Sequence, residues 1–244
     1  MSVENGTTDI WVYLSTSPLI GLTATLLAYN LGYRLYLRFN RNPLLNPVVS
    51  AIVALIVFLQ LTDIPYDTYF QGAQFVHFLL GPATVALAVP LYQQCAKIKE
   101  RLLPLFLTLI VGAIVGAVSS VGIAWLLGAS REVQMSLAPK SVTTPVAMGI
   151  SEQIGGLPSL TAVLVVATGI IGATMGSTLF KLLSLKDDAV KGVAFGIAAH
   201  GIGTARAFQL SKEMGAFAGL AMALSALTSA VVLPWLLVVF GWLQ

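Results

Sequence analysis

The chain has 244 residues, of which 57% are hydrophobic and only 9% are charged, and its formal net charge is +3. Charged residues make up about 25% of an ordinary soluble domain, so this composition excludes a soluble protein and indicates one that crosses a lipid bilayer several times. A charge this small and dispersed does not suggest a nucleic-acid partner. The lone Cys95 gives neither a disulfide framework nor a cysteine-based metal site.

Apolar runs long enough to cross a bilayer recur along nearly the whole sequence. They predict an all-α polytopic membrane protein with about six full spans, at residues 11–33, 48–61, 73–94, 102–127, 158–182 and 215–243. Residues 1–10 lack the features of a signal peptide, so we expect the first span to be retained. We expect one integral membrane domain over residues 1–244, made of N-terminal spans at 1–130 and two hairpin-plus-span segments at 131–184 and 185–244.

Basic residues gather in three of the polar connections between spans. Cytoplasmic loops carry an excess of Lys and Arg, so we expect these connections on the cytoplasmic side and the N-terminus outside. The expected location is therefore the cell (inner) membrane, with multiple passes. The three basic groups are Arg34, Arg38 and Arg41; Lys97, Lys99 and Arg101; and Lys181, Lys186 and Lys191.

A polar, proline-containing segment at residues 136–156 interrupts this pattern. Arg131 is expected outside and Lys186 inside, and the span at 158–182 already provides one crossing, so the segment must cross either twice or not at all. Its length and the central Thr143-Thr144-Pro145 break favour two half-helices that meet at depth and return to the outer side. We therefore predict a re-entrant hairpin.

A second segment, residues 191–210, resembles the first when Thr204 is set against Thr144 and the offset is kept constant. Because one full span separates the two, the second hairpin would enter from the cytoplasm, which gives the inverted repeat found in many secondary transporters. Chance similarity between two segments rich in Ala and Gly is the alternative. The matching pairs include Ala138/Ala198, Thr144/Thr204, Ala147/Ala207, Ser151/Ser211 and Gly155/Gly215.

The break of the first hairpin predicts an anion site. Thr144 before Pro145 is typical of a helix start, which would direct free N–H groups and the positive end of the helix dipole toward the break. Lys140 adds a cation, and the hydroxyls of Ser141 and Thr143 add hydrogen-bond donors. This combination favours a bound anion.

The second break has a related set of residues. Gly201 and Gly203 are expected to let the backbone turn, with Thr204 as the helix cap and with His200 and Arg206 beside it. Since Arg can bind a carboxylate through two hydrogen bonds, we expect a small organic anion, such as a monocarboxylate, between the two breaks. The alternatives are that the two cations cap helix carbonyls or reach the membrane interface, and that the hydroxyls only satisfy the broken backbone.

Four further residues are secondary candidates for the transport path. Asn46 lies beside a proline, where a turn into the next span is the simpler interpretation. Glu152 would either lie at the outer mouth of the first hairpin or pair with Lys140. The other two, Pro82 and Thr84, follow a glycine in the third span.

Motifs of enzymes and of ATP-driven transporters are missing from the sequence. We therefore expect no catalytic activity, no metal and no cofactor, and any transport would be secondary or facilitated. Whether an ion such as H⁺ or Na⁺ is coupled to it stays open.

Four groups of residues form recognisable motifs: Asn42-Pro43-Leu-Leu-Asn46-Pro47, Pro82-Ala-Thr-Val-Ala-Leu-Ala-Val-Pro90-Leu-Tyr92, Pro139-Lys-Ser-Val-Thr-Thr-Pro145 with Gly155-Gly156, and His200-Gly-Ile-Gly-Thr-Ala-Arg206. In these motifs the sequence resembles the LrgB/CidB family, over roughly residues 20–240. Bacterial members of that family are described as holin-like or antiholin-like proteins that affect murein hydrolase export and cell lysis. A plastid member, similar in its second half, exchanges glycolate and glycerate, and some bacterial pairs are associated with pyruvate uptake.

The resemblance implies two functions, of which the residues at the breaks favour the first. This is secondary transport of glycolate-, glycerate- or pyruvate-like monocarboxylates by alternating access, and the alternative is a holin-like or antiholin-like role in murein hydrolase regulation. The sequence has no LrgA-like segment, so the resemblance also implies an LrgA/CidA-like membrane partner. Small-residue helix faces lead us to expect a homodimer.

Overall fold

The computed structural model describes residues 18–39, 45–86 and 88–239, and the regular elements in these ranges are helices. The chain forms two compact units, Met1–Ala86 and Leu87–Gln244. The expectations for residues 1–10, the start of the first span, Arg41, the Asn42-Pro43 pair and the last residues of the sixth span lie outside the described residues, and so does the side of the N-terminus. The single-domain organisation stays a prediction.

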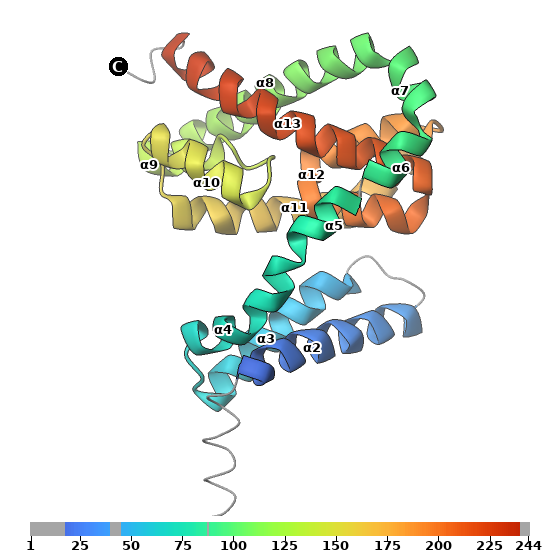
Figure 1. Cartoon of the computed structure of the whole chain (residues 1–244). Coiled ribbons are helices and arrows are strands. Elements are labelled where there is room, and N and C mark those ends of the chain that lie inside the picture. Colours follow the sequence, from blue (N-terminus) through green and yellow to red (C-terminus); the bar gives the residue numbers. More distant parts are fainter. Residues whose placement is uncertain (1–17, 40–44, 87, 240–244) are drawn as a thin grey trace, which may run out of the picture. The chain divides into compact units, whose positions relative to one another are not determined.

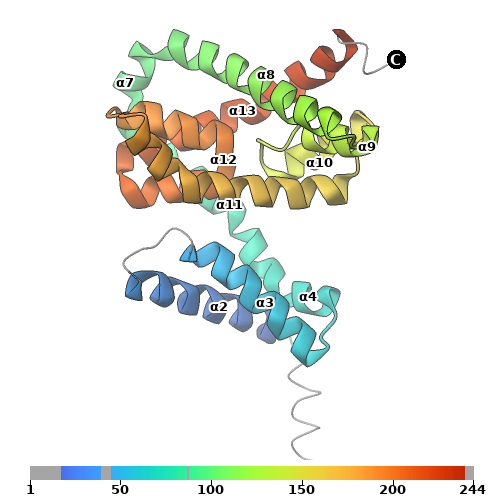
Figure 2. The same cartoon turned by 180° about the vertical axis from the view of Figure 1, so that it is seen from behind.

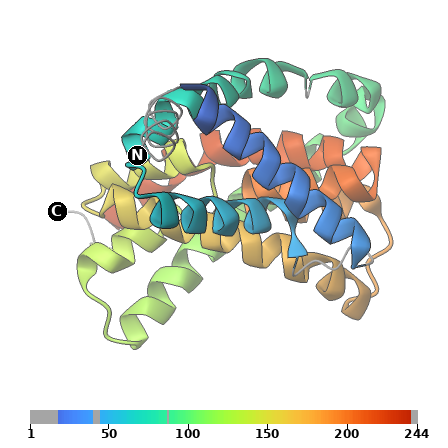
Figure 3. The same ribbon diagram turned by 90° about the horizontal axis from the view of Figure 1, so that it is seen from below.

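The first unit is built from α2 (Pro18–Arg38), α3 (Pro47–Thr62), α4 (Tyr66–Phe78) and α5 (Leu80–Ala86). α2 and α3 lie side by side (Figure 3). Gly32 permits their close approach, because a Cβ there would lie 2.9 Å from the carbonyl oxygen of Pro47. Asn46 starts α3 as its cap, with Oδ1 accepting a hydrogen bond from Val48 N at 2.9 Å.

Two expected boundaries in this unit are wrong. α2 continues through Arg38, so Arg34 and Arg38 lie on the helix instead of in a loop after it, as suits good helix formers near a helix C-terminus. The third helical stretch begins at Tyr66 instead of residue 73, and Asp67 in its first turn suits the helix dipole there. A helix is confirmed at residues 48–61, where α3 lies, while its crossing of the membrane stays a prediction.

The second unit holds the segment expected to carry function. The spans expected at residues 102–127 and 158–182 are confirmed as α8 and α11, and α8 ends before the left-handed Gly128, with φ 74°. α13 begins at Lys212, slightly before the expected start of the last span. The described helices are α6 (Ala88–Gln93), α7 (Cys95–Glu100), α8 (Leu102–Leu126), α9 (Arg131–Leu137), α10 (Thr144–Gln153), α11 (Pro158–Leu182), α12 (Asp188–Leu210) and α13 (Lys212–Val239).

Within the described ranges, four stretches are long and apolar enough to cross a membrane: Tyr66–Gln93, Leu102–Leu126, Pro158–Leu182 and Lys212–Leu236. α3 is apolar but shorter. Large apolar side chains lie exposed on the long helices, as with Leu103 at 72% and Val163 at 65%. Exposed apolar surface of this extent marks contact with lipid. The all-α polytopic membrane class is therefore confirmed.

α9 and α10 form a hairpin that closes on the start of α11. Leu157 N donates to Ser136 Oγ at 2.8 Å, which brings the start of α11 against α9. Thr161 Oγ1 hydrogen-bonds Ser136 O at 3.1 Å and Ser151 Oγ at 2.7 Å, and these three polar residues are fully buried. The hairpin predicted from residues 136–156 is thus present and begins earlier, at Arg131.

α12 is also a hairpin, because its backbone leaves the helical conformation at His200. Gly192 and Gly196, in its first half, pack against Met214 and Ala218 of α13. The equal spacing of the contacts on both helices means that they run in the same direction. The second half of α12 must therefore run back to the end where α12 began.

α11 separates the two hairpins, which lie toward its opposite ends (Figures 1 and 2). It runs antiparallel to the first half of α12, since a Cβ on Gly172 would meet Ala199 and one on Gly176 would meet Phe195. Each hairpin thus opens at a different end of α11. This is the inverted arrangement expected from the repeat in the sequence.

Candidate functional site

The first break covers residues 138–143, between α9 and α10. Thr143 is the extended residue before α10, with φ −64° and ψ 146°, and α10 begins with Thr144 and Pro145. The cap is therefore Thr143, whereas the sequence pattern predicted Thr144. The side chain of Thr143 makes no capping hydrogen bond. The first amide groups of α10 consequently have no side-chain cap at the break.

Lys140 lies at this break and is partly buried. Its Nζ donates to Gly116 O of α8 at 3.5 Å and to Ser141 Oγ at 3.3 Å. Within the described part of the chain no carboxylate forms an ion pair with it, and Glu152 is exposed near the end of α10. The alternative that Glu152 pairs with Lys140 is therefore wrong. The contact with Gly116 is not a helix cap, because Gly116 lies in the interior of α8 and not at its end.

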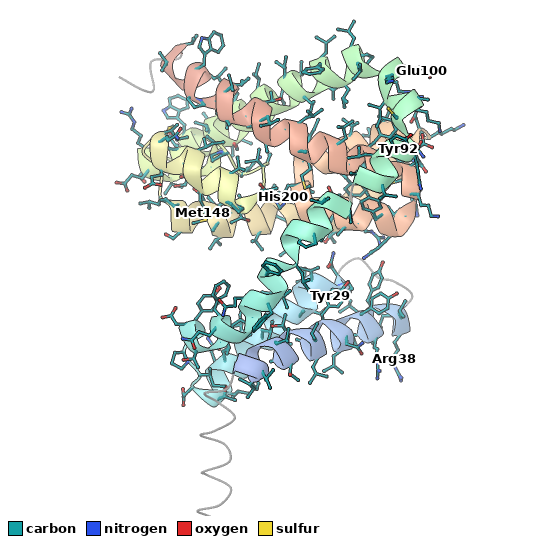
Figure 4. The ribbon with its side chains drawn as sticks, viewed as in Figure 1. Tyr29, Arg38, Tyr92, Glu100, Met148 and His200 are labelled. Atoms are coloured by element: carbon teal, nitrogen blue, oxygen red, sulfur yellow. The ribbon has the colours of Figure 1, made fainter. Side chains whose placement is uncertain are left out.

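The second break is carried by His200, whose φ of 38° and ψ of −129° are unusual for a residue with a side chain. It lies in the interior of the second unit (Figure 4), with 4% of its surface exposed. Its Nε2 is 2.9 Å from Val165 O on α11. Gly169 makes room for the imidazole, since a Cβ there would lie 2.7 Å from His200 Cε1.

The remaining residues at this break have different roles from those expected. The positive φ occurs at His200 and not at Gly201 or Gly203. Gly203 serves close packing, because a Cβ there would lie 2.7 Å from Phe195 O. Thr204 is not a cap; it lies within the helix and donates to His200 O at 2.8 Å, so it satisfies a carbonyl at the break.

Arg206 is buried on the second half of α12, with 9% of its surface exposed. Its Nη1 donates to Gln209 Oε1 at 3.1 Å, on the same helix. The guanidinium thus contacts a side chain of its own hairpin arm.

An open groove of about 630 Å³ joins the first break to the end of the first half of α12. Lys140 and Ser141 line it, and so do Ile197 and Ala198, which come shortly before His200. The structure therefore places two residues of the first break in one groove with Ile197 and Ala198 of the first half of α12. Thr143, Thr144, His200, Gly201, Gly203, Thr204 and Arg206 are not among the residues that line the groove.

Two polar residues of the groove were missed in the sequence. Thr108 of α8 and Thr168 of α11 both line it, and each hydroxyl donates to the carbonyl one helical turn earlier, at 2.7 Å. A lone threonine in an apolar helix was the only available signal, and that pattern is common in membrane helices. Their hydroxyl oxygens can still accept hydrogen bonds within the groove.

The open end of the second hairpin is held by charged side chains. Asp187 Oδ2 accepts from Arg101 Nη1 at 2.6 Å, and Glu213 Oε2 accepts from Lys97 Nζ at 2.8 Å. The hydrogen bond from Arg101 lowers the pKa of Asp187. These two ion pairs connect the residues just before and just after α12 to the segment formed by α7 and Arg101.

The secondary candidates are not among the residues that line this groove. Asn46 caps α3, which supports the simpler interpretation of a turn. Pro82 and Thr84 lie on α5 in the first unit, and the side chain of Thr84 is outside the described residues. Among described residues, no group of three or more His, Cys, Asp or Glu side chains could hold a metal ion.

Comparison with known proteins gives relatives over nearly the whole chain. YwbG of Bacillus subtilis is 35% identical over 222 residues, which cover 90% of this chain and 97% of the relative. The holin-like protein CidB of Staphylococcus epidermidis is 33% identical over 228 residues, covering 93% and 98%. The antiholin-like protein LrgB of Bacillus mycoides is 31% identical over 225 residues, covering 92% and 98%. No solved structure matches.

The sequence model of the LrgB-like family matches residues 25–239, a range that includes both breaks and, apart from the start of α2, the described helices of both units. Together with these relatives, which align along almost their full length, this match shows that the chain belongs to the LrgB-like family.

Proposed function

We propose that this chain is a holin-like or antiholin-like membrane protein that modulates murein hydrolase export and cell lysis. The observation that carries the proposal is that relatives with these names align with this chain over 98% of their own length. The several apolar helices of the chain agree with such a role at a membrane. This function was the alternative to transport when only the sequence was considered.

A direct test is to express the chain in a bacterium that lacks its own relatives of this family. Secreted murein hydrolase activity and the rate of cell lysis should change in the same direction, upward for holin-like and downward for antiholin-like action. An unchanged hydrolase pattern and lysis rate, with the chain present in the membrane, would overturn the proposal.

A second candidate is the transport of small organic anions such as glycolate, glycerate or pyruvate, and Lys140 is the observation that favours it. The side chain is a partly buried cation in an open groove, and no carboxylate neutralises it within the described residues. Intramembrane charge is costly and usually functional. The uncapped amides of α10 add positive potential at the same break.

The arrangement of the hairpins suggests how such an anion would cross. Two hairpins that open at opposite ends of α11, and that line one groove with residues 140–141 and 197–198, would give one site that can face either side in turn. In this scheme Lys140 and Ser141 bind the carboxylate. The flanking Thr108 and Thr168 offer hydroxyls to a hydroxy or keto group of the same molecule.

The two candidates give opposite results in liposomes made with the purified chain. A pore releases a large trapped dye, whereas a transporter retains the dye and moves labelled glycolate or pyruvate. Lys140→Gln should reduce labelled flux at least tenfold, and Lys186→Gln, which changes an exposed loop lysine, should leave it unchanged. Equal flux in wild type and Lys140→Gln would show that Lys140 does not bind the anion. Release of the dye would contradict the transporter function.

The assembly and location of the chain are further proposals. An LrgA/CidA-like partner, a homodimer, a cell inner membrane location and an N-terminus outside agree with the family and with the basic connections. Coupling to H⁺ or Na⁺ would follow only if transport is found. Labelling of single cysteines from either side of the membrane would test the orientation.

A further inference from the structure

A second cavity lies between the start of α8 and the start of α12, beside the Lys140 groove, with which it shares Thr108 and Ala194 in its lining. It has a volume of about 180 Å³ and is lined by Leu105 of α8, Val190 and Val193 of α12, and Phe217 of α13. Arg101 lies at its rim, directly before the first residue of α8. The cavity is thus an apolar pocket with a guanidinium at one end.

The chemistry of this pocket selects an apolar guest. Thr108, the other polar residue in its lining, already donates its hydroxyl to Pro104 O at 2.7 Å. An apolar lining offers water few hydrogen-bond partners and favours apolar guests. Water or a small hydrated anion therefore has little to gain here, whereas a hydrocarbon chain replaces unfilled space with contacts.

The place of the pocket also matches a lipid. Arg101 and Asp187 directly precede α8 and α12, so the pocket lies within the first two turns of these helices, of which α8 is long and apolar enough to cross a membrane. Basic residues in the connections at this end identify it as the cytoplasmic side. Anionic lipid head groups at that surface attract Lys and Arg.

Arg101 can accept an additional anion. Its Nη1 donates to Asp187, but a guanidinium has five N–H donors in a planar fork. Its side chain is 44% exposed, so a phosphate can reach the remaining donors. Lys97 is already paired with Glu213, and neither Lys97 nor Lys99 is among the residues that line the pocket, so the phosphate contact is assigned to Arg101.

We propose that this pocket binds one acyl chain of an anionic glycerophospholipid of the cytoplasmic leaflet, with the lipid phosphate on Arg101. Because Arg101 also holds Asp187, the bound lipid would contact the open end of the second hairpin. The proposal concerns lipid binding alone, so it does not depend on whether the chain acts as a pore, a lysis modulator or a transporter.

The test uses the full chain purified in a neutral detergent, with its melting temperature measured as lipid is added. Phosphatidylglycerol should raise the melting temperature more than phosphatidylcholine with the same acyl chains. Glycerol phosphate, which has the head group without the chain, should give no shift. Equal shifts with the two lipids, or a shift with glycerol phosphate alone, would overturn the proposal.

Four variants locate the effect at this pocket. Arg101→Gln removes the phosphate contact, and Val190→Trp fills the pocket from a half-exposed position, so each should lose most of the difference between the two lipids. Lys99→Gln, an exposed cation outside the pocket lining, should retain the difference.

Asp187→Asn is the control for the ion pair, because it keeps an amide that can cap α12 while Arg101 remains. It should keep or enlarge the difference between the lipids. Loss of the difference in Asp187→Asn, or its retention in Arg101→Gln or Val190→Trp, would contradict the proposed site.

Discussion

The two hairpins share one backbone plan but are closed in different ways. The first is closed by hydroxyl groups without charge: Ser136, Ser151 and Thr161 hydrogen-bond one another and the start of α11, and all three residues are fully buried. The second is closed by Asp187 and Glu213, whose cationic partners lie on a different segment and are about half exposed. Related segments have thus reached the same shape through different interactions.

The repeat is visible in single residues. Ser151 and Ser211 are matching positions of the repeat, and each lies at the closing end of its hairpin, where Ser151 contacts Thr161 and Ser211 binds Asp188 and Met214 N. Lys140 and His200 match at the same offset, and each contacts a carbonyl of the preceding long helix. The two hairpins therefore keep the same backbone arrangement, but buried hydroxyl groups close the first and exposed ion pairs close the second.

Gly156→Ala should have the largest effect, because it forces the first hairpin open. The added Cβ would overlap Ser151 Oγ and lie 2.8 Å from Ser136 N, which is backbone and cannot rotate away. Overpacking of this kind destabilises by about 1–3 kcal/mol. Gly149→Ala is the matched control on the same hairpin, since its Cβ meets nothing within 4 Å and alanine favours the helix. Thermal unfolding in detergent measures both, and equal melting temperatures would contradict the tight closure.

Thr161→Val should cause the next largest loss of stability, and this loss should not depend on the salt concentration. It removes a buried hydroxyl and leaves Ser151 and the carbonyl of Ser136 with one partner fewer, at a cost of about 1–3 kcal/mol. Thr174→Val is a suitable control, because that hydroxyl only donates to Ile170 O within its own helix. If the loss in Thr161→Val disappeared at high salt, the neutral character assigned to the first hairpin would be wrong.

Glu213→Gln should have the smallest effect, and the effect should vanish at high salt. Exposed ion pairs of this kind contribute about 0–1 kcal/mol, and at about 1 M salt the screening length is only about 3 Å. Hydrogen exchange should therefore rise near the start of α13 at low salt only, and the amides of α10 should be unaffected. A larger loss of stability in Glu213→Gln than in Thr161→Val would show that the ion pairs contribute more than the buried hydroxyl groups.

The pH dependence separates the two hairpins in the same way. Arg101 holds the pKa of Asp187 below the value of about 3.9 for an unfolded chain, and Lys191 likewise lowers the pKa of Asp188. A lowered carboxyl pKa stabilises the fold above that value, and the contribution is lost as the pH falls through the folded pKa. Below about pH 3.9, exchange corrected for its intrinsic rate should therefore rise at the start of α12 and not at the hydroxyl contacts of the first hairpin. Equal changes at both would show that the carboxylates do not hold the second hairpin.

Sequence alone determined the membrane class, α8 and α11 nearly to the residue, and the presence of two hairpins, because apolar runs, prolines and basic connections are local signals. Only the tertiary structure decided how the breaks are formed. It moved the cap from Thr144 to Thr143 and the backbone turn from the glycines to His200, a strained conformation that Gly169 and Val165 of another helix make possible. It also put Lys140 in a groove and Arg206 on its own hairpin arm, because the direction of a side chain depends on which helices pack around it, and that packing joins residues far apart in the chain.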